Sequence, residues 1–110
     1  MATYMFQFSY SLESVKGMVA KPQNRRDAAE KVLAATGGRL LDMFFCFGDY
    51  DGVAIAEFPS NVDVAAASLA ISSSWAFSRV KTTVLITMDE SIQAMEKAGA
   101  VSGAYTPPAG

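Results

Sequence analysis

Residues 39–59 decide the fold, and they read RLLDMFFCFGDYDGVAIAEFP. Two largely apolar runs, 39–47 and 53–58, flank the polar segment GDYDG at 48–52. Glycine adopts left-handed backbone geometry readily, and aspartate closes turns through its own side chain. The spacing therefore predicts a β-hairpin. Pro59 ends its second strand, because proline has no N–H for the strand ladder.

The first strand of this hairpin is apolar on both sides. Strict alternation would place Leu41, Met43, Phe45 and Phe47 on one face and Leu40, Phe44 and Cys46 on the other, where Asp42 interrupts them. A strand with two apolar faces is typical of a sheet that is covered on both sides.

The segments before the hairpin predict one strand and one longer helix. In residues 3–10, four aromatic residues recur with period two and share one face: Tyr4, Phe6, Phe8 and Tyr10. Ser11 then resembles a helix cap, followed by a short helical turn that Gly17 weakens. After Pro22 the pattern predicts a helix over 23–36, and Gly37-Gly38 ends it.

The segments after the hairpin predict two helices around one strand. A helix over 62–73, capped by Ser60 or Asn61, would bury a stripe of Val62, Ala66, Leu69 and Ala70. A strand follows over 77–88. Asp89 would cap a short helix over 90–98 with Ile92 and Met95 facing inward.

This order, β-α-β-β-α-β, predicts an α+β fold of the ferredoxin-like, split β-α-β type. Its four-stranded antiparallel sheet has the order 4-1-3-2, and both helices cover one face. The uncovered face would carry apolar side chains, which favours a dimer with two sheets stacked about 10 Å apart. We expect one domain over 1–99 and a proline-containing tail over 100–110. Tyr105-Thr106-Pro107-Pro108 would dock on the body or on a neighbouring subunit, unless the tail is an ordinary disordered terminus.

Several segments carry a resemblance to a known family. They are Thr3-Tyr4, Gly37-Gly38, the turn Gly48-Asp49-Tyr50-Asp51, Val53-Ala54-Ile55, Glu57-Phe58-Pro59 and Ala104-Tyr105-Thr106-Pro107-Pro108. Together they resemble the GYD-domain family, small bacterial proteins of uncharacterised function. The resemblance implies the dimeric ferredoxin-like α+β barrel and a homodimer, and it implies no particular activity.

Composition excludes several function classes. The 110 residues carry nine Lys and Arg against eleven Asp and Glu, a net charge of −2, so charge gives no reason to expect nucleic-acid binding. One cysteine excludes an internal disulfide, and the absence of histidine excludes the common zinc sites and Ser-His or Cys-His nucleophiles. We expect no cofactor, no signal peptide, no membrane partner and a cytoplasmic location.

The topology brings the ends of several strands together and predicts a candidate ligand pocket there. Its members are Tyr10, Tyr50, Asp51, Trp75 and Arg79, with Asp49 beside them. Aromatic walls with a few charged groups are typical of ligand sites. The alternative is structural: Tyr50 fills the end of the barrel, and Asp51 pairs with Arg79.

Two isolated residues carry weaker hypotheses. Asp42 is either an acid with a raised pKa or an edge-strand charge that discourages aggregation. Cys46 has no basic neighbour in sequence, which indicates a buried, inert thiol.

Two functions remain open from the sequence. The first is a homo-oligomeric small-molecule-binding or accessory protein, whose partners are its own copies and a possible small ligand. The alternative is a cofactor-free enzyme of the oxygenase or isomerase type acting on a small hydrophobic substrate. Its base would be Asp51 or Asp42, with Tyr50 or Arg79 as the orienting group.

Overall fold

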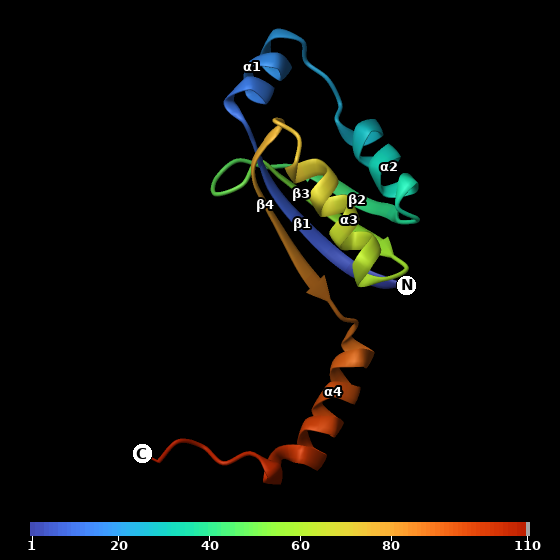
Figure 1. Ribbon diagram of the computed structural model, residues 1–110, viewed down its shortest axis with the longest axis vertical. Helices are drawn as coiled ribbons and strands as arrows, with labels where there is room; N and C mark the ends of the chain where they lie inside the picture. Colours follow the sequence, from blue (N-terminus) through green and yellow to red (C-terminus); the bar gives the residue numbers. More distant parts are fainter. Residues whose placement is uncertain (110) are drawn as a thin grey trace.

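A four-stranded antiparallel sheet forms the body of the computed structural model, which describes residues 1–109 (Figure 1). Its strands are β1 (Ala2–Tyr10), β2 (Arg39–Phe45), β3 (Gly52–Phe58) and β4 (Phe77–Leu85). Their order across the sheet is β2-β3-β1-β4, and each neighbouring pair is antiparallel. The predicted ferredoxin-like order is confirmed.

Two helices, α2 (Arg26–Ala35) and α3 (Asn61–Ser72), cover one face of the sheet; in Figure 1, α3 lies in front of the strands and α2 lies at the right, beside β2. The alternation predicted for β1 is confirmed, since its four aromatic side chains are buried beneath these helices. Tyr4 and Phe58 are fully buried, and the Tyr4 hydroxyl donates to Asn61 Oδ1 at 2.6 Å. That bond ties β1 to the start of α3.

The connection from β1 to β2 contains one more helix than expected. α1 (Leu12–Ala20) is a nine-residue helix whose Ser11 cap accepts from the Ser14 N–H. Gly17 does not interrupt it. The next helix begins at Arg26, three residues later than predicted, where Asn24 Oδ1 accepts from the Arg26 N–H at 2.9 Å. Residues 21–25 form the loop between the two helices.

A bulge in β2 overturns the predicted alternation of that strand. Leu40 lies opposite Ala56 and Asp42 lies opposite Ile55, so Leu41 is an extra residue in the ladder. An extra residue reverses the facing of everything beyond it. Leu40 therefore shares the helix-covered face with Met43 and Phe45, whose ladder partners are Ala54 and Gly52. Asp42 and Phe44 lie on the open face.

α3 buries a different stripe from the predicted one. Val64 and Ala67 are buried, whereas Val62 and Leu69 are exposed. The helix is apolar around most of its circumference, and such a helix has no single stripe that periodicity can identify. Ser60 is its cap, with the Ser60 hydroxyl accepting from the Asp63 N–H.

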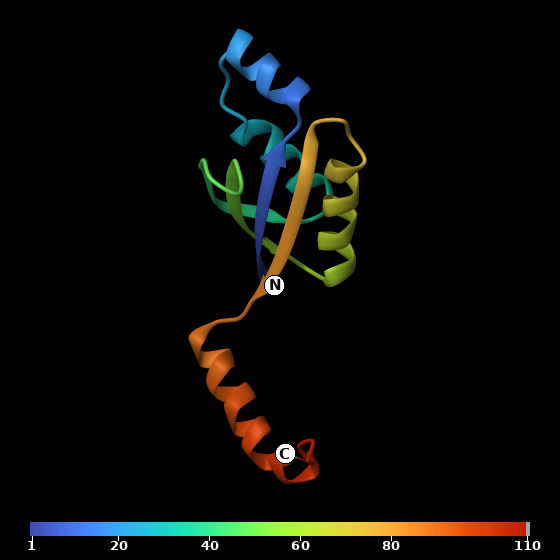
Figure 2. The same cartoon turned by 90° about the vertical axis from the view of Figure 1, so that its left-hand side faces the viewer.

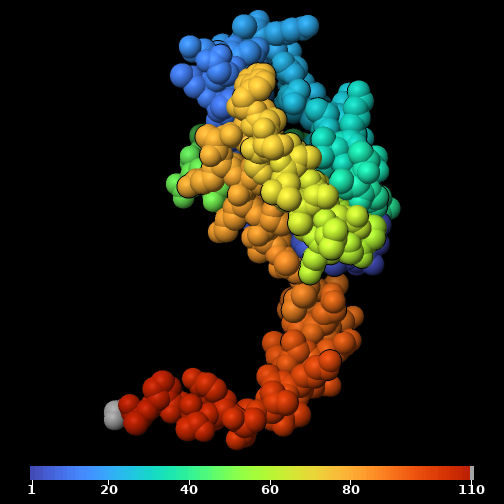
Figure 3. Space-filling view, in the orientation of Figure 1, coloured from blue at the N-terminus to red at the C-terminus, as the bar shows by residue number. Residues whose placement is uncertain are grey.

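The chain leaves the sheet after β4, which ends at Leu85 instead of Met88. α4 (Met88–Val101) projects beyond the end of the sheet, followed by a short 3₁₀ turn, η1 (Ser102–Ala104) (Figures 1 and 2). The space-filling view shows the same arm joined to the body by a narrow neck (Figure 3). The radius of gyration is 17.9 Å, whereas a compact domain of this length has about 13 Å.

Two predictions about the C-terminal region are therefore wrong. The cap of α4 is Thr87, not Asp89, and it forms a capping box with Glu90. Ile92 and Met95 are exposed, because the helix lies beside no core. The helix itself is longer than the predicted 90–98, since it begins at Met88 and ends at Val101.

The tail is exposed throughout residues 102–109, so it does not dock on its own domain; Gly110 lies outside the described residues. Docking on a neighbouring subunit stays a prediction. Within residues 1–109, no helix is long and apolar enough to cross a membrane.

Candidate functional site

A cleft of about 510 Å³ opens where α1 and the loop 21–25 lie over the end of the sheet. One wall comes from α1, through Val15, Met18 and Val19. The opposite wall comes from β1, β2 and the start of β3, and it includes Phe8, Tyr10, Met43, Phe45, Asp51 and Gly52. Figure 1 shows that α1 carries the chain beyond the end of the sheet before the loop 21–25 returns it to α2, and residues of α1 and of this loop line the cleft.

A second, smaller cavity of about 110 Å³ lies between α2 and the sheet. Its lining is almost wholly apolar and includes Phe6, Ala28, Ala29, Val32, Leu40 and Ala54. Four residues line both this cavity and the cleft: Phe8, Tyr10, Arg25 and Met43. The two spaces therefore adjoin at these side chains, and Arg25 is the charged group where they meet.

Gly52 gives the Phe8 ring its place in the floor of the cleft. A Cβ on Gly52 would lie 2.3 Å from Phe8 Cε2 and 2.4 Å from Cζ. Ordinary contacts of a Cβ are about 1 Å longer, so no other residue fits without moving the ring. Phe8 also packs edge-on against Tyr10 and Phe77, with centroids 5.6 and 5.5 Å away.

Asp51 joins the end of β1 to the start of β3. Its Oδ2 accepts from the Tyr10 N–H at 2.9 Å, and its own N–H donates to the Phe8 carbonyl, also at 2.9 Å. An ionised acceptor makes a stronger hydrogen bond than a neutral one. Asp51 thus has a structural bond and is also one of the residues that line the cleft.

Burial raises the pKa of Tyr10 above its usual value. The nearby Arg25 guanidinium lowers that pKa and partly offsets the burial, while the Asp51 carboxylate raises it. At neutral pH the Tyr10 hydroxyl therefore keeps its proton and can donate a hydrogen bond.

Tyr50 and Arg79 form a separate pair at the same end of the sheet. The Arg79 guanidinium carbon lies 4.3 Å from the centroid of the Tyr50 ring, and Nη2 donates to the Asp49 carbonyl at 2.6 Å. The hypothesised ion pair between Asp51 and Arg79 does not form. Arg79 instead closes the β2–β3 loop by a cation–π contact and a hydrogen bond.

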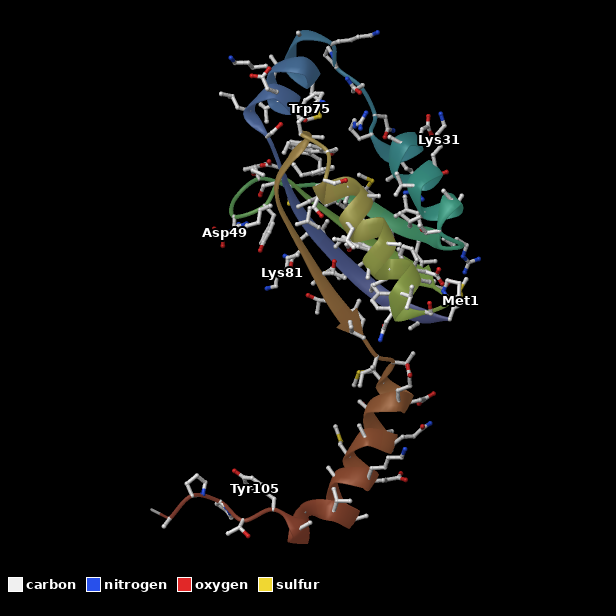
Figure 4. All side chains as sticks on the ribbon, in the orientation of Figure 1. Met1, Lys31, Asp49, Trp75, Lys81 and Tyr105 are labelled. Atoms are coloured by element: carbon white, nitrogen blue, oxygen red, sulfur yellow. The ribbon has the colours of Figure 1, made fainter. Side chains whose placement is uncertain are left out.

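Trp75 lies apart from both groups. It is 73% exposed in the α3–β4 connection and lines neither the cleft nor the inner cavity. Figure 4 shows Trp75 and Asp49 at the α1 end of the sheet, on separate segments. Of the five residues predicted to share a pocket, the structure places Tyr10 and Asp51 in the cleft, pairs Tyr50 with Arg79 and separates Trp75.

Arg25 is the residue that sequence reasoning missed. Its neighbour Arg26 is bonded to Glu30, four residues on, with Nε to Oε1 at 2.8 Å. Arg25 has Ala29 at the equivalent position, and its Nη1 donates to Gln23 Oε1 at 3.0 Å. An arginine at a helix start without a carboxylate one turn later was the available signal.

Comparison with known proteins agrees with this fold. The family model described as the GYD domain matches residues 4–95. The chain belongs to the GYD domain family. In this GYD domain, the segment from Gly48 to Asp51 supplies the β2–β3 loop, with Tyr50 under Arg79 and Asp51 at the cleft.

Solved structures share the architecture at low sequence identity. The crystal structure of FFRP-DM1 is 18% identical with a TM-score of 0.54, over 78% of this chain and 100% of that one. A hypothetical protein, PHS023, from Pyrococcus horikoshii is 18% identical with a TM-score of 0.52, over 79% and 92%. At this identity the likeness concerns the fold alone. The search of curated proteins found no match.

The remaining candidate residues of the GYD domain, Asp42 and Cys46, lie on β2 and directly after it. Asp42 is exposed on the open face beside the bulge. Cys46 is half-buried, and its thiol donates to the Tyr50 carbonyl at 3.2 Å. Among residues 1–109, no three carboxylate or thiol side chains gather in the manner of a metal site.

Proposed function

We propose that the protein is a homo-oligomeric, small-molecule-binding protein of the cytoplasm. The observation that carries the proposal is the cleft at the end of the sheet together with the apolar cavity that adjoins it under α2. A concave, mostly apolar site with a few polar groups at its edge is the usual form of a ligand site. The unpaired Cys46 favours a reducing compartment.

The open face of the sheet supports self-association. Register places Met5, Val53, Ile55, Phe44 and Leu85 on this face, opposite to the helices. Phe44 is 58% exposed in a single copy, and the other four are half-buried. A second copy stacked on this face would bury these side chains as sandwiched sheets do.

The α4 arm gives a second reason for self-association. Met88, Ile92 and Met95 recur at helical spacing on one side, and all three are exposed. A 14-residue helix is only marginally stable in water unless an apolar stripe packs on something. In our proposal the stripe packs on the second copy, since it is exposed among residues 1–109.

The oligomer is tested by sedimentation velocity at micromolar concentration. We expect a dimer or larger species for the unmodified chain. Leu85→Glu and Phe44→Glu should shift the population toward monomer, because each places a charge on the open face. Lys31→Glu, on the exposed surface of α2, is the matched control and should leave the mass unchanged. A folded monomer for the unmodified chain would overturn the homo-oligomeric part.

Ligand binding is tested by native mass spectrometry of freshly purified protein, followed by a thermal-shift screen. We expect a co-purified small molecule, or a screening hit whose effect is abolished by Ala28→Leu, which fills the inner cavity. The melting temperature of the unliganded variant controls for folding. If neither method finds a ligand, the binding part is overturned.

No observation favours the enzymatic alternative over binding. The Asp51 carboxylate is engaged by the Tyr10 N–H, and Asp42 is exposed on the sheet away from the cleft lining. Tyr50 and Arg79 contact each other and line neither space.

A further inference from the structure

We infer that the cleft and the inner cavity together bind a small monocarboxylic acid with a compact apolar body. This inference rests on the proposed ligand-binding function and adds the chemical class of the ligand. In the bound arrangement, the apolar body occupies the cavity under α2. The carboxylate lies at the junction of cavity and cleft, where Arg25 is.

The size of the cavity limits the apolar body. Its volume of about 110 Å³ is below the roughly 150 Å³ of an engineered apolar cavity that binds benzene. A short branched alkyl chain or one small ring therefore matches it. Longer chains would have to extend back into the cleft, between α1 and β2.

The charge at the junction selects an anionic group. Arg25 lines both spaces and forms no ion pair with any of residues 1–109. Its guanidinium has five donors, of which Gln23 takes one. A carboxylate matches this planar fork through two parallel hydrogen bonds. Arg26 also borders the cleft, but Glu30 already neutralises it.

Tyr10 favours binding of the ligand's carboxylate, and Asp51 disfavours a second carboxylate on the same ligand. The Tyr10 hydroxyl lies near Arg25 and keeps its proton at neutral pH, so it offers a second donor. Asp51 is one of the residues that line the cleft, and its carboxylate carries the same charge as the ligand. It would repel a second carboxylate that extended into the cleft, so the site favours a monoacid over a diacid.

The test compares acids with neutral analogues of the same shape. The probes are 3-methylbutanoate and benzoate, their amides, and 3-methylglutarate as the diacid, titrated into the full chain by isothermal calorimetry and amide NMR. We expect the acids to bind more tightly than their amides and than the diacid. Shifts should occur at Phe8, Tyr10 and the first turn of α2.

Variants separate the charge from the cavity. Arg25→Gln should weaken binding of the acids by about tenfold or more, as expected for loss of a charged hydrogen bond, and should leave the amides unaffected. Lys31→Gln, on the exposed surface of α2 and outside the lining of both spaces, is the matched control and should change neither. Tyr10→Phe should weaken the acids by a few fold, and the melting temperature of each variant reports folding.

Two failures would have different meanings. If the amides bind as tightly as the acids and Arg25→Gln has no effect, the carboxylate inference is overturned while ligand binding in the cavity stands. If neither series shifts the cavity resonances, this inference is overturned. The proposed binding function then depends on its own test by native mass spectrometry.

Discussion

Gly52→Ala should strongly destabilise the domain through one contact. The added methyl would lie 2.3 Å and 2.4 Å from two atoms of the Phe8 ring, so the ring has to move by more than 1 Å. The ring is buried against Tyr10 and Phe77, and β1 is paired on both sides. Overpacking a core in this way costs about 1–3 kcal/mol, and the packing of the ring against Tyr10 and Phe77 favours the upper end of that range, about 3 kcal/mol.

Urea unfolding followed by far-UV circular dichroism measures this loss. With an m-value of about 1.5–3 kcal/mol/M, about 3 kcal/mol corresponds to a midpoint lowered by about 1–2 M. All samples need the same protein concentration, since an oligomer's stability depends on it. Gly17→Ala is the matched control: its Cβ would meet nothing within 4 Å, and alanine in a helix is more stable than glycine by about 1 kcal/mol.

A double-mutant cycle with Phe8→Leu isolates the contact. Leucine lacks the distal ring atoms that the methyl would meet, so Gly52→Ala in that background should cost about 1 kcal/mol or less. The coupling free energy is then about 2 kcal/mol, within the range for residues in contact. Strictly additive effects, or a Gly52→Ala variant as stable as the unmodified chain, would refute the reasoning.

Three further predictions concern polar groups at this end of the sheet. Asp51→Ala should lower the free energy of unfolding by about 1.5–3 kcal/mol because the Tyr10 N–H loses a charged acceptor. Asp51→Asn should lower it less, since the amide oxygen still accepts that hydrogen bond. Equal urea midpoints for the two variants would contradict this. Because the pKa of Tyr10 is raised in the folded state, its contribution to stability is complete below the unfolded pKa of 10.0. That contribution is lost as the pH rises from there through the folded pKa. Melting temperatures between about pH 8 and 11 should therefore fall less steeply in Tyr10→Phe than in the unmodified chain. Arg79→Met should cost about 0.5–1 kcal/mol through the lost contact with Tyr50, and it should speed amide hydrogen exchange in residues 46–51; unchanged exchange would argue against a closing role.

Two residues of the candidate site, Tyr10 and Asp51, were predictable because strand ends follow from topology. Once β1 is a central strand and 48–52 is a hairpin turn, Tyr10 and Asp51 must lie at the same edge of the sheet, and the structure has them bonded there. Arg25 was not predictable in this way, because its position depends on the path of the loop 21–25. That path follows from α1 being a full helix, and Gly17 made the sequence signal for α1 weak.

The partners of Arg79 also required the structure. A guanidinium near two aspartates and a tyrosine has several acceptors within reach, and sequence distance does not rank them. The Asp51 carboxylate is already held by the Tyr10 N–H, which leaves the Asp49 carbonyl and the Tyr50 ring for Arg79.

The sequence by itself determined the strands, the hairpin and the order of elements across the sheet. These depend on local periodicity and turn chemistry, which a stretch of ten residues contains in full. The aromatic face of β1 and the glycine-bounded turn at 48–52 are of this kind, and they were sufficient for the ferredoxin-like arrangement.

Only the tertiary structure decided which surfaces meet. The extra residue at Leu41 reverses part of β2, α3 buries Val64 in place of Val62, and α4 leaves the body altogether. In each case the local pattern is compatible with two arrangements, because both faces of the segment are apolar or because its stripe has no fixed partner. The choice depends on packing between residues far apart in the chain, and sequence periodicity does not contain that information.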